Sequence, residues 1–268
     1  MPDWLKSMQR TYEYYIVDPG TWKDMKRITN VKSCNINRDL EVETLGSATF
    51  DVTESLGECY VRAYLVTNQN GLTDKVPLGT FLVQSPTSNF TGRLRKVTLD
   101  AYTPLLELKE NQPPLGYSIL KDANIMDNAY RIAREHARAP VVMTECSEVL
   151  YDNFVSNIDD TWITFLRDLT ANAKYELSLD ELGRILFSPK QDTASLQPVW
   201  TYNDDNSSIL QPELTIAHDL YGIPNVVEVV YSRGAGHYYA RVVNDDANSP
   251  TSTVSRGREL IHRVIDPE

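Results

Sequence analysis

The stretch DLYGIPNVVEVVYSRGAGHYYARVVNDDANSPTSTVSRGR, residues 219–258, decides how the fold of this chain is interpreted. Its apolar, β-branched run Val226–Tyr231 is typical of a strand, and Tyr238–Val243 returns as a second strand. Gly234-Ala-Gly236 lies between them and supplies residues for which a positive φ costs little, so the sequence predicts a β-hairpin. The polar segment Asn244–Pro250 is typical of an ordered crossing, and nothing in the stretch resembles a nucleophile, a general base or a metal cage.

The composition describes an acidic globular protein. The 268 residues are enough for two core-bearing domains, and 41% hydrophobic with 24% charged residues argues against disorder and against a membrane protein. No apolar run approaches the roughly 20 residues needed to cross a bilayer. The N-terminal segment lacks the apolar core of a secretory signal, so we expect synthesis in the cytosol. The formal charge of −11 argues against non-specific binding to nucleic acid.

The three cysteines, Cys34, Cys59 and Cys146, are widely spaced and form no CxxC pair. Their odd number and spacing argue against a disulfide framework and against a zinc site. We expect them to be small buried apolar side chains.

The first 110 residues predict a β-rich domain. Short aromatic and β-branched runs recur between turn-rich gaps without a helical period, as in antiparallel barrels and sandwiches. Asn70-Gly71 is the strongest local marker of a hairpin. The signal is β as far as about Leu108, and the predicted strands are Tyr12–Val17, Asn30–Leu40, Ala48–Val52, Cys59–Thr67, Gly79–Gln84 and Leu94–Ala101.

The composition changes at Asn111–Gly116, where we place a domain boundary. Apolar residues at helical spacing predict a helix within Asp122–Ala139. A second helix is predicted through Trp162, with Ser156–Asp159 as its capping box. It leads into a hairpin, Tyr175–Phe187. Further on, the chain runs through Trp200–Tyr202, and the sequence predicts a polar loop at Asn203–Ser208 and a short strand at Glu213–Ala217.

The predicted fold is therefore α+β and mainly β. It contains a first antiparallel barrel domain at residues 1–110 and a helix-and-hairpin insertion at 117–190. A second barrel begins in residues 191–268, and we expect it to be incomplete before Glu268.

Candidate catalytic groups are weakly supported. No two of His136, His218, His237 and His262 stand at HxxxH spacing, and His218-Asp219 is accompanied by no nucleophile motif. His136 lies on an apolar helix face, where a core histidine is expected. The acidic doublets Asp159-Asp160, Asp204-Asp205 and Asp245-Asp246 are adjacent pairs that rarely present both carboxylates to one substrate. The loop Asn203–Ser208 is rich in oxygen ligands but lacks the arrangement of a calcium loop.

Two further features favour contacts rather than chemistry. Arg256 and Arg258 form a pair that could bind a carboxylate or phosphate bidentately, and in so acidic a chain a carboxylate is the expected partner. The fifteen tyrosines could line a sugar-binding groove, although a strand-rich chain accounts for most of them.

An ordered set of short motifs carries a family resemblance over residues 157–258. It comprises WITFLRDL from Trp162, KYELSLDELG with Asp180 and Gly183, WTYNDDNSS from Trp200, DLYGIPNVV with Pro224 and Asn225, and Asn244 with Asn248-Ser249-Pro250-Thr-Ser and Arg256-Gly257-Arg258. In order and spacing this set resembles the hub proteins at the tip of long-tailed phage tails. The first 110 residues match that family only in their β-rich character and a SCNINRDL-like opening strand.

The resemblance implies a homotrimeric ring with two tail-tube-like barrels per chain. It places the motif residues in structural roles and implies no catalytic, cofactor-binding or metal-binding residue. It implies contacts with the tail tube or distal tail protein, the tape-measure protein and tip or receptor-binding proteins, while DNA only passes through the channel. Three copies would carry a formal charge of −33, which would discourage adhesion of DNA wherever the acids face inward.

We therefore predict a non-enzymatic virion protein of the tail tip or baseplate, made in the host cytoplasm. A receptor- or carbohydrate-binding tail module is the alternative, suggested by the tyrosines. A glycosidase or peptidase, suggested only by the acidic doublets and His218, is a third.

Overall fold

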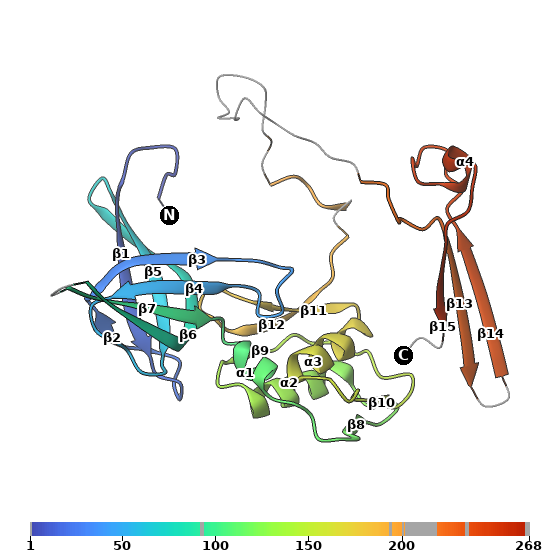
Figure 1. Ribbon diagram of the computed structural model, residues 1–268, viewed down its shortest axis with the longest axis horizontal. Coiled ribbons are helices and arrows are strands. Elements are labelled where there is room, and N and C mark those ends of the chain that lie inside the picture. Colours follow the sequence, from blue (N-terminus) through green and yellow to red (C-terminus); the bar gives the residue numbers. More distant parts are fainter. Residues whose placement is uncertain are drawn as a thin grey trace. The chain divides into compact units, whose positions relative to one another are not determined.

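The computed structural model describes residues 2–91, 94–192, 195–199, 201, 219–233 and 236–265. The chain divides into two compact units, an N-terminal unit of residues 1–196 and a C-terminal unit of residues 197–268 (Figure 1). Of the described helices, none has the length and apolar character that a bilayer crossing needs.

A seven-stranded antiparallel sheet forms the first half of the N-terminal unit. Its strand order is β2-β1-β5-β6-β7-β4-β3. The twenty-residue strand β6 pairs with β5 through its first half and with β7 through its second. The strands are β1 (Gln9–Val17), β2 (Asp24–Ile28), β3 (Val31–Asn37), β4 (Ser47–Val52), β5 (Tyr60–Gln69), β6 (Leu72–Thr91) and β7 (Leu94–Tyr102).

The sheet encloses an apolar core because alternate residues of its strands point the same way. In β4, Ala48, Phe50 and Val52 are buried while the residues between them are partly exposed. The Asn70-Gly71 hairpin is confirmed, with φ of 53° and 80° at the two turn residues joining β5 to β6. The mainly β, antiparallel character is also confirmed. Among the described strands no pairing joins the edges β2 and β3, so the predicted barrel is not confirmed.

Three helices and short strands follow the sheet. The short helix α1 (Leu106–Glu110) begins within the stretch for which we predicted only β structure. Leu105, Leu106 and Leu108 are buried there against the other helices, so tertiary packing decides the local conformation. Helix α2 (Ile125–His136) lies where predicted, and its N-cap Asn124 accepts a hydrogen bond from the Asp127 amide.

Helix α3 (Trp162–Ala171) is present, but its predicted capping box was wrong. Thr161 is the N-cap and pairs reciprocally with Thr164, three residues further on. Asp160 lies just before the helix and accepts hydrogen bonds from the Asn157 amide and the Thr164 hydroxyl. The threonine pair therefore takes the role that we assigned to Ser156–Asp159.

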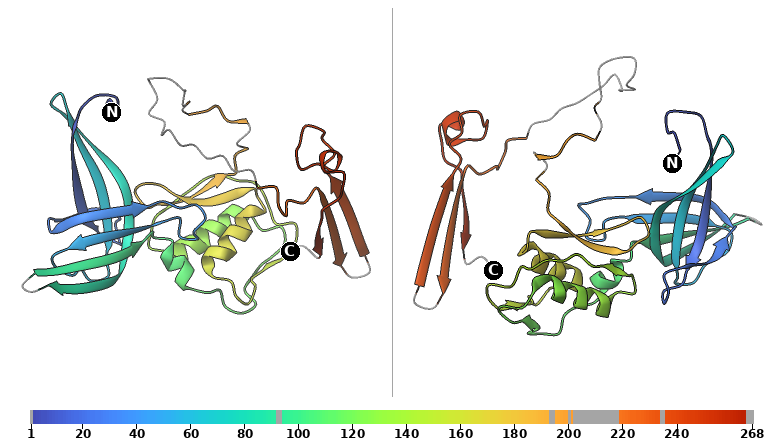
Figure 2. Two further views of the ribbon diagram at one scale, coloured as in Figure 1. Left: turned by 45° about the horizontal axis from the view of Figure 1, so that its top comes forward. Right: turned by 180° about the vertical axis from the view of Figure 1, so that it is seen from behind.

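Helices α2 and α3 pack on one face of a three-stranded sheet of order β11-β12-β9 (Figure 1). Its strands are β9 (Val141–Val142), β11 (Tyr175–Leu179) and β12 (Ile185–Pro189), and the predicted hairpin is confirmed as β11–β12. Gly183 occupies the turn with φ of +74°, a value that favours glycine. A two-stranded pair, β8 (Ser118–Ile119) and β10 (Phe154–Val155), lies beyond the helices (Figures 1 and 2).

In the C-terminal unit, β13 (Val226–Arg233) and β14 (Gly236–Val243) form the predicted hairpin. The sequence reading missed β15 (Ile261–Ile265), which pairs with β13 in parallel, and the four-residue helix α4 (Thr253–Arg256) that precedes it. The predicted turn residues 234–235, His218, and most of the predicted elements from Trp200 to Ala217 lie outside the described residues.

Candidate functional site

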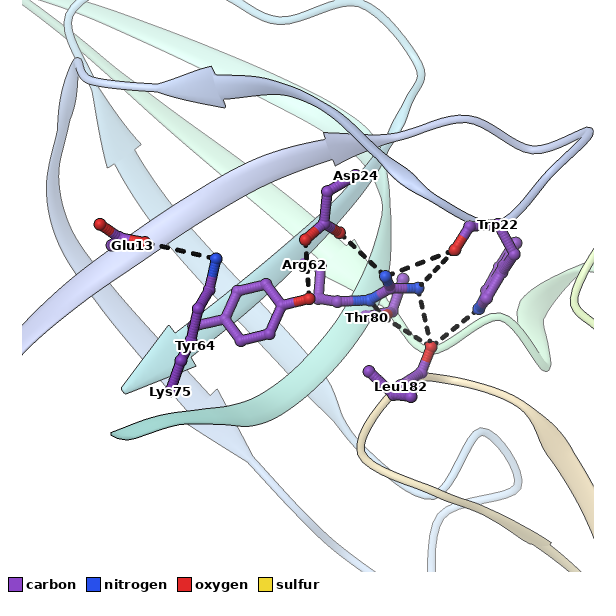
Figure 3. Close-up of polar contacts among 8 residues, drawn as sticks. All are labelled: Glu13, Trp22, Asp24, Arg62, Tyr64, Lys75, Thr80 and Leu182. Carbon is purple, nitrogen blue, oxygen red and sulfur yellow. Dashed lines mark hydrogen bonds and ion pairs between the residues drawn. The ribbon is translucent and has the colours of Figure 1, made fainter. Parts of the chain in front are cut away.

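Two polar joints stand out in the structure, one in each unit. The first fastens the β11–β12 hairpin to the seven-stranded sheet. The Leu182 carbonyl in the hairpin turn accepts three hydrogen bonds, from Trp22 Nε1 at 2.8 Å, Thr80 Oγ1 at 2.9 Å and Arg62 Nη2 at 3.1 Å (Figure 3). A single main-chain oxygen thus connects the turn to β5, β6 and the segment before β2.

Arg62 is the centre of this first joint and is only 4% exposed. Its guanidinium pairs with the Asp24 carboxylate at 2.9 Å and donates to Thr80 Oγ1 at 2.8 Å and to the Trp22 carbonyl (Figure 3). Asp24 also accepts from the Tyr64 hydroxyl at 2.7 Å. Burial, with this hydrogen bond, raises the pKa of Tyr64. A buried charge with this many partners is stable where an unpaired one would not be.

The joint continues along the sheet through Lys75. Its ammonium lies 4.0 Å from the ring centroid of Tyr64 and 3.3 Å from Glu13 Oε2 (Figure 3). It also lies 3.9 Å from the ring centroid of Tyr15. Two aromatic faces and a carboxylate therefore hold one cation.

The motif residues Asp180 and Gly183 shape the turn that presents Leu182. Asp180 accepts from the amide and from Nε of Arg184, and its carbonyl accepts from the Gly183 amide at 2.9 Å. A Cβ at Gly183 would lie 2.7 Å from Thr80 Cβ. Glycine is therefore required both by the positive φ and by the close approach of the turn to the sheet.

Trp162 is placed apart from this joint, at the first position of α3, and is 3% exposed. Its ring stacks on His136, with centroids 4.1 Å apart and planes 17° apart, and meets Tyr117 edge to face. Burial lowers the pKa of His136, so the imidazole is predominantly neutral at pH 7. His136 therefore serves as a packing residue against the Trp162 ring.

The second joint closes one end of the C-terminal sheet around Asn225, which is buried, and Asn244, which is half-buried. Asn225 is 3% exposed, donates from Nδ2 to the Arg258 carbonyl at 2.9 Å and accepts at Oδ1 from the Leu260 amide at 2.7 Å. The main-chain carbonyl of Asn225 accepts a hydrogen bond from the main-chain amide of Asn244. The main-chain carbonyl of Asn244 in turn accepts from the amide and the hydroxyl of Thr253. The two residues tie β13, β14 and the entry to β15 together.

The remaining motif residues surround these asparagines. Asn244 Nδ2 donates to Ser249 Oγ at 3.1 Å, and Asn248 donates to Asp246. Arg256 donates to the carbonyls of Ile223 and Leu220, at 2.9 and 2.6 Å. Within the described chain, the partners given to the Arg256 guanidinium are thus main-chain oxygens, and the predicted carboxylate partner of the Arg256 and Arg258 pair stays a prediction. Gly257 ends α4 with φ of +61°, and Pro224 and Pro250 are exposed in the flanking turns.

The structure thus gathers Asn225, Asn244, Asn248, Ser249, Arg256 and Gly257 into one network, and Asp180 and Gly183 into another. The sequence reading missed Trp22, Asp24, Arg62 and Thr80. The arginine within the apolar run YVRAYLV was the available signal, because a charge inside a buried strand needs a partner.

Neither joint holds a reactive constellation. Across the described ranges, no three His, Cys, Asp or Glu side chains come together as a metal site requires. The three cysteines are unpaired and half-buried, and burial raises the pKa of Cys34 to about 11, which disfavours its thiolate at neutral pH. Asp246 is engaged with its own turn. The Asp204-Asp205 doublet and the loop Asn203–Ser208 lie outside the described residues.

No protein-family model matches the chain, and no match is found among curated proteins. Solved structures do share its fold. The tail protein from Neisseria meningitidis MC58 aligns with 95% of this chain and 71% of its own length, at a TM-score of 0.64 and 16% identity. The prophage MuSo2 tail protein from Shewanella oneidensis aligns over 95% and 72%, at 0.58 and 11%.

The prophage tail protein gp18 from Listeria monocytogenes EGD-e aligns over 95% of this chain and 72% of its own, at a TM-score of 0.55 and 10% identity. A PdpA–VgrG complex covers 98% of this chain and 50% of its own, at 0.53 and 8%. At such identities the likeness concerns the fold. The chain has the fold of these tail proteins.

Proposed function

We propose that this chain is a structural protein of a phage tail, located in the virion at the tail tip or baseplate. In this proposal it forms a homotrimeric hub ring that connects the tail tube to the tip and encloses the channel for DNA and the tape-measure protein. Its partners are further copies of itself, the tail tube or distal tail protein, the tape-measure protein and tip or receptor-binding proteins. The chain performs no catalysis.

The observation that carries this proposal is the shared fold. The three tail proteins each align with 95% of the chain, so the likeness includes both units. Motif residues take part in both polar joints: Asp180 and Gly183 shape the turn of the first, and Asn225, Asn244 and Arg256 hold the second together through hydrogen bonds. These residues therefore have the character of a rigid wall element and not of a reactive site.

The C-terminal sheet supplies a physical reason for assembly. One of its faces is composed of apolar side chains beside His262, because the register places alternate residues of the three strands together. Tyr238 and Val242 on this face are 66% and 69% exposed. We name it the apolar sheet face; its apolar residues are Val227, Val229, Tyr231, Tyr238, Ala240, Val242 and Val264.

A three-stranded sheet needs a covered apolar face for stability, and its edge strands expose unpaired main-chain groups. In the proposed ring, neighbouring copies cover the apolar sheet face, and strands from adjacent subunits complete barrel walls of the tail-tube type. Self-association then satisfies both requirements.

The positions of the tyrosines give little support to the alternative function, a receptor- or carbohydrate-binding tail module. Tyr238 and Tyr239 are adjacent in β14 and so project from opposite faces of the sheet. Tyr238 lies 6.4 Å from Tyr231, centroid to centroid, and Tyr239 donates to Glu228. A glycan array separates the two functions, and the hub proposal expects no binding.

Light scattering on a sizing column, with electron microscopy, tests the proposal. We expect a species of about 91 kDa, three times the 30.4 kDa of the chain, and rings that cap tubes when tail-tube protein is added. A strictly monomeric species that forms no rings with tube protein would overturn it. Cell-wall hydrolysis abolished by His218→Ala would overturn the non-enzymatic part.

A further inference from the structure

Strand β11 forms the outer edge of the three-stranded sheet, whose order is β11-β12-β9 (Figure 1). Hydrogen bonds at its two ends fix which of its main-chain groups point to β12. The Lys190 amide donates to the Lys174 carbonyl at 2.8 Å, and the Asp180 amide donates to the Arg184 carbonyl at 3.1 Å. Both bonds fit the regular antiparallel register of β11 with β12, so every second residue of β11 bonds to β12.

The residues between them leave a free edge. Tyr175, Leu177 and Leu179 point their main-chain amides and carbonyls away from β12. In the described part of the chain, no group pairs with these amides and carbonyls. Strand β11 contains no proline and its register has no bulge, so two of the features that protect edge strands are missing from it. Such an edge is a template on which a further strand can pair.

A groove of about 990 Å³ runs along this free edge. Five consecutive residues, from Lys174 to Ser178, line one side of it, which shows that the groove follows the strand. The other sides are formed by Arg167, Asp168 and Ala171 of α3, by Leu40 and Leu45 of the β3–β4 loop, and by Lys190, Gln191 and Asp192 after β12. The volume is at the upper end of the range of ligand pockets, which suits a segment of polypeptide better than an ion.

The walls of the groove are held in place. Arg167 Nη2 donates to the Glu43 carbonyl at 2.8 Å, which ties the β3–β4 loop to α3. The Lys109 ammonium pairs with the carboxylate of the same glutamate at 2.8 Å and joins the loop to α1. Leu45 packs against the core that contains Leu177. A groove with fixed walls needs little ordering when a ligand binds, so less of the binding free energy is lost.

The two faces of β11 differ in character, and this difference defines the side chains that suit an added strand. Leu177 is 6% exposed, and Tyr175 and Leu179 pack on the same side, against the helices. Glu176 and Ser178 project from the opposite face. Residues directly opposite each other on neighbouring strands share a face. An added strand therefore needs apolar side chains at every second position, toward the helices, and polar side chains between them.

We propose that the groove binds an extended segment of a partner protein, which pairs with the free edge of β11 as a fourth strand and alternates apolar with polar side chains. Main-chain hydrogen bonds supply the affinity of this binding mode, and alternate side chains supply its specificity. Symmetric pairing of two copies through β11 is disfavoured, because each edge lies inside a groove and the walls of one would meet the walls of the other. The occupant is therefore a lone extended segment.

The probe is a fluorescent eight-residue peptide in which four leucines alternate with two lysines and two glutamates. Fluorescence anisotropy with the full chain should show saturable binding. Two further peptides carry N-methyl groups, one on the four leucines and the other on the four polar residues. Successive amides of a strand point to opposite edges, so one methylated peptide should lose at least tenfold in affinity while the other stays within threefold.

Hydrogen exchange followed by NMR locates the contact on the chain. With the unmodified peptide bound, the amides of Tyr175, Leu177 and Leu179 should exchange at least tenfold more slowly. The amides of Glu176 and Ser178 should change less, because they already bond to β12.

A pair of variants makes the result specific to the groove. Ala171→Trp places a ring in the groove at an exposed position of α3, so it should leave folding intact and weaken peptide binding at least tenfold. Asn172→Trp adds the same ring at the next position, which is also exposed and lies outside the groove lining. This control should stay within twofold of the wild-type affinity.

Absence of saturable binding, equal affinity of the two methylated peptides, or binding that Ala171→Trp leaves intact would overturn the proposal. Unchanged exchange at Leu177 with the peptide bound would also contradict it. So would self-association of the wild type that Ala171→Trp abolishes, because the occupant would then be a second copy. These measurements do not depend on ring formation, so the proposal stands or falls apart from the proposed hub function.

Discussion

The substitution Gly183→Ala tests how tightly the β11–β12 hairpin is docked on the sheet. Gly71→Ala is its matched control, because it introduces the same backbone strain at a turn where the added Cβ meets no neighbour. Both glycines occupy hairpin turns, with φ of +74° and +80°. A Cβ at Gly71 meets nothing within 4 Å, whereas a Cβ at Gly183 meets Thr80 Cβ at 2.7 Å. The conformational penalty is therefore shared, and only Gly183→Ala forces the turn away from the sheet.

The expected magnitudes follow from the contacts at Leu182. A left-handed alanine costs about 1 to 2 kcal/mol at either position. Ordinary carbon contacts are about 3.5 to 4.0 Å, so the turn around Gly183 must retreat by about 1 Å. Its carbonyl hydrogen bonds from Trp22, Thr80 and Arg62 then lengthen, and each neutral bond contributes about 0.5 to 1.5 kcal/mol. We expect destabilisation of about 3 to 4 kcal/mol for Gly183→Ala and about 1 for Gly71→Ala.

Urea unfolding followed by tryptophan fluorescence measures both values. The Trp22 indole loses its hydrogen bond in Gly183→Ala alone, so the native-state emission of that variant should also change. A difference below about 0.5 kcal/mol between the two variants would contradict the claim that the hairpin is rigidly fastened to the sheet.

Three more outcomes are expected. Arg62→Met leaves a partly buried carboxylate without its cation and should cost about 3 kcal/mol in urea unfolding, against less than about 0.5 for Lys6→Met in an exposed pair. Asn225→Ala removes a buried side chain with two hydrogen bonds and should lower the melting temperature of the C-terminal unit, whereas exposed Asn248→Ala should change it little. Hydrogen bonds and a nearby lysine lower the pKa of Asp51 to about 2. The extra stability of wild type over Asp51→Asn should therefore be complete above about pH 4 and be lost as the pH falls toward 2 in acid titrations.

Local signals explain what the sequence could predict. Asn70-Gly71, the DELG turn and the run Val226–Tyr231 each determine their own conformation through few neighbouring residues, and the structure has the corresponding hairpins. Helix α3 was found for the same reason, because its apolar stripe repeats at helical spacing.

Long-range contacts explain what the sequence could not predict. Leu182 accepts from Trp22, 160 residues away, and nothing near either residue indicates the pairing. The sequence shows the motif around Asn225 only as a pattern of residues. The hydrogen bonds that explain it join Asn225 to the chain before β15, and only the fold brings these residues together. Helix α4 has four residues, too few to show a helical period.

Sedimentation velocity on the wild type and on Val242→Lys tests the central claim of assembly most directly. Val242 is 69% exposed on the apolar sheet face, so a lysine there should leave folding intact while introducing a charge between copies. The proposed ring predicts a wild-type species near 91 kDa and a variant near 30.4 kDa. A wild type that remains at the mass of one chain at all concentrations would contradict it.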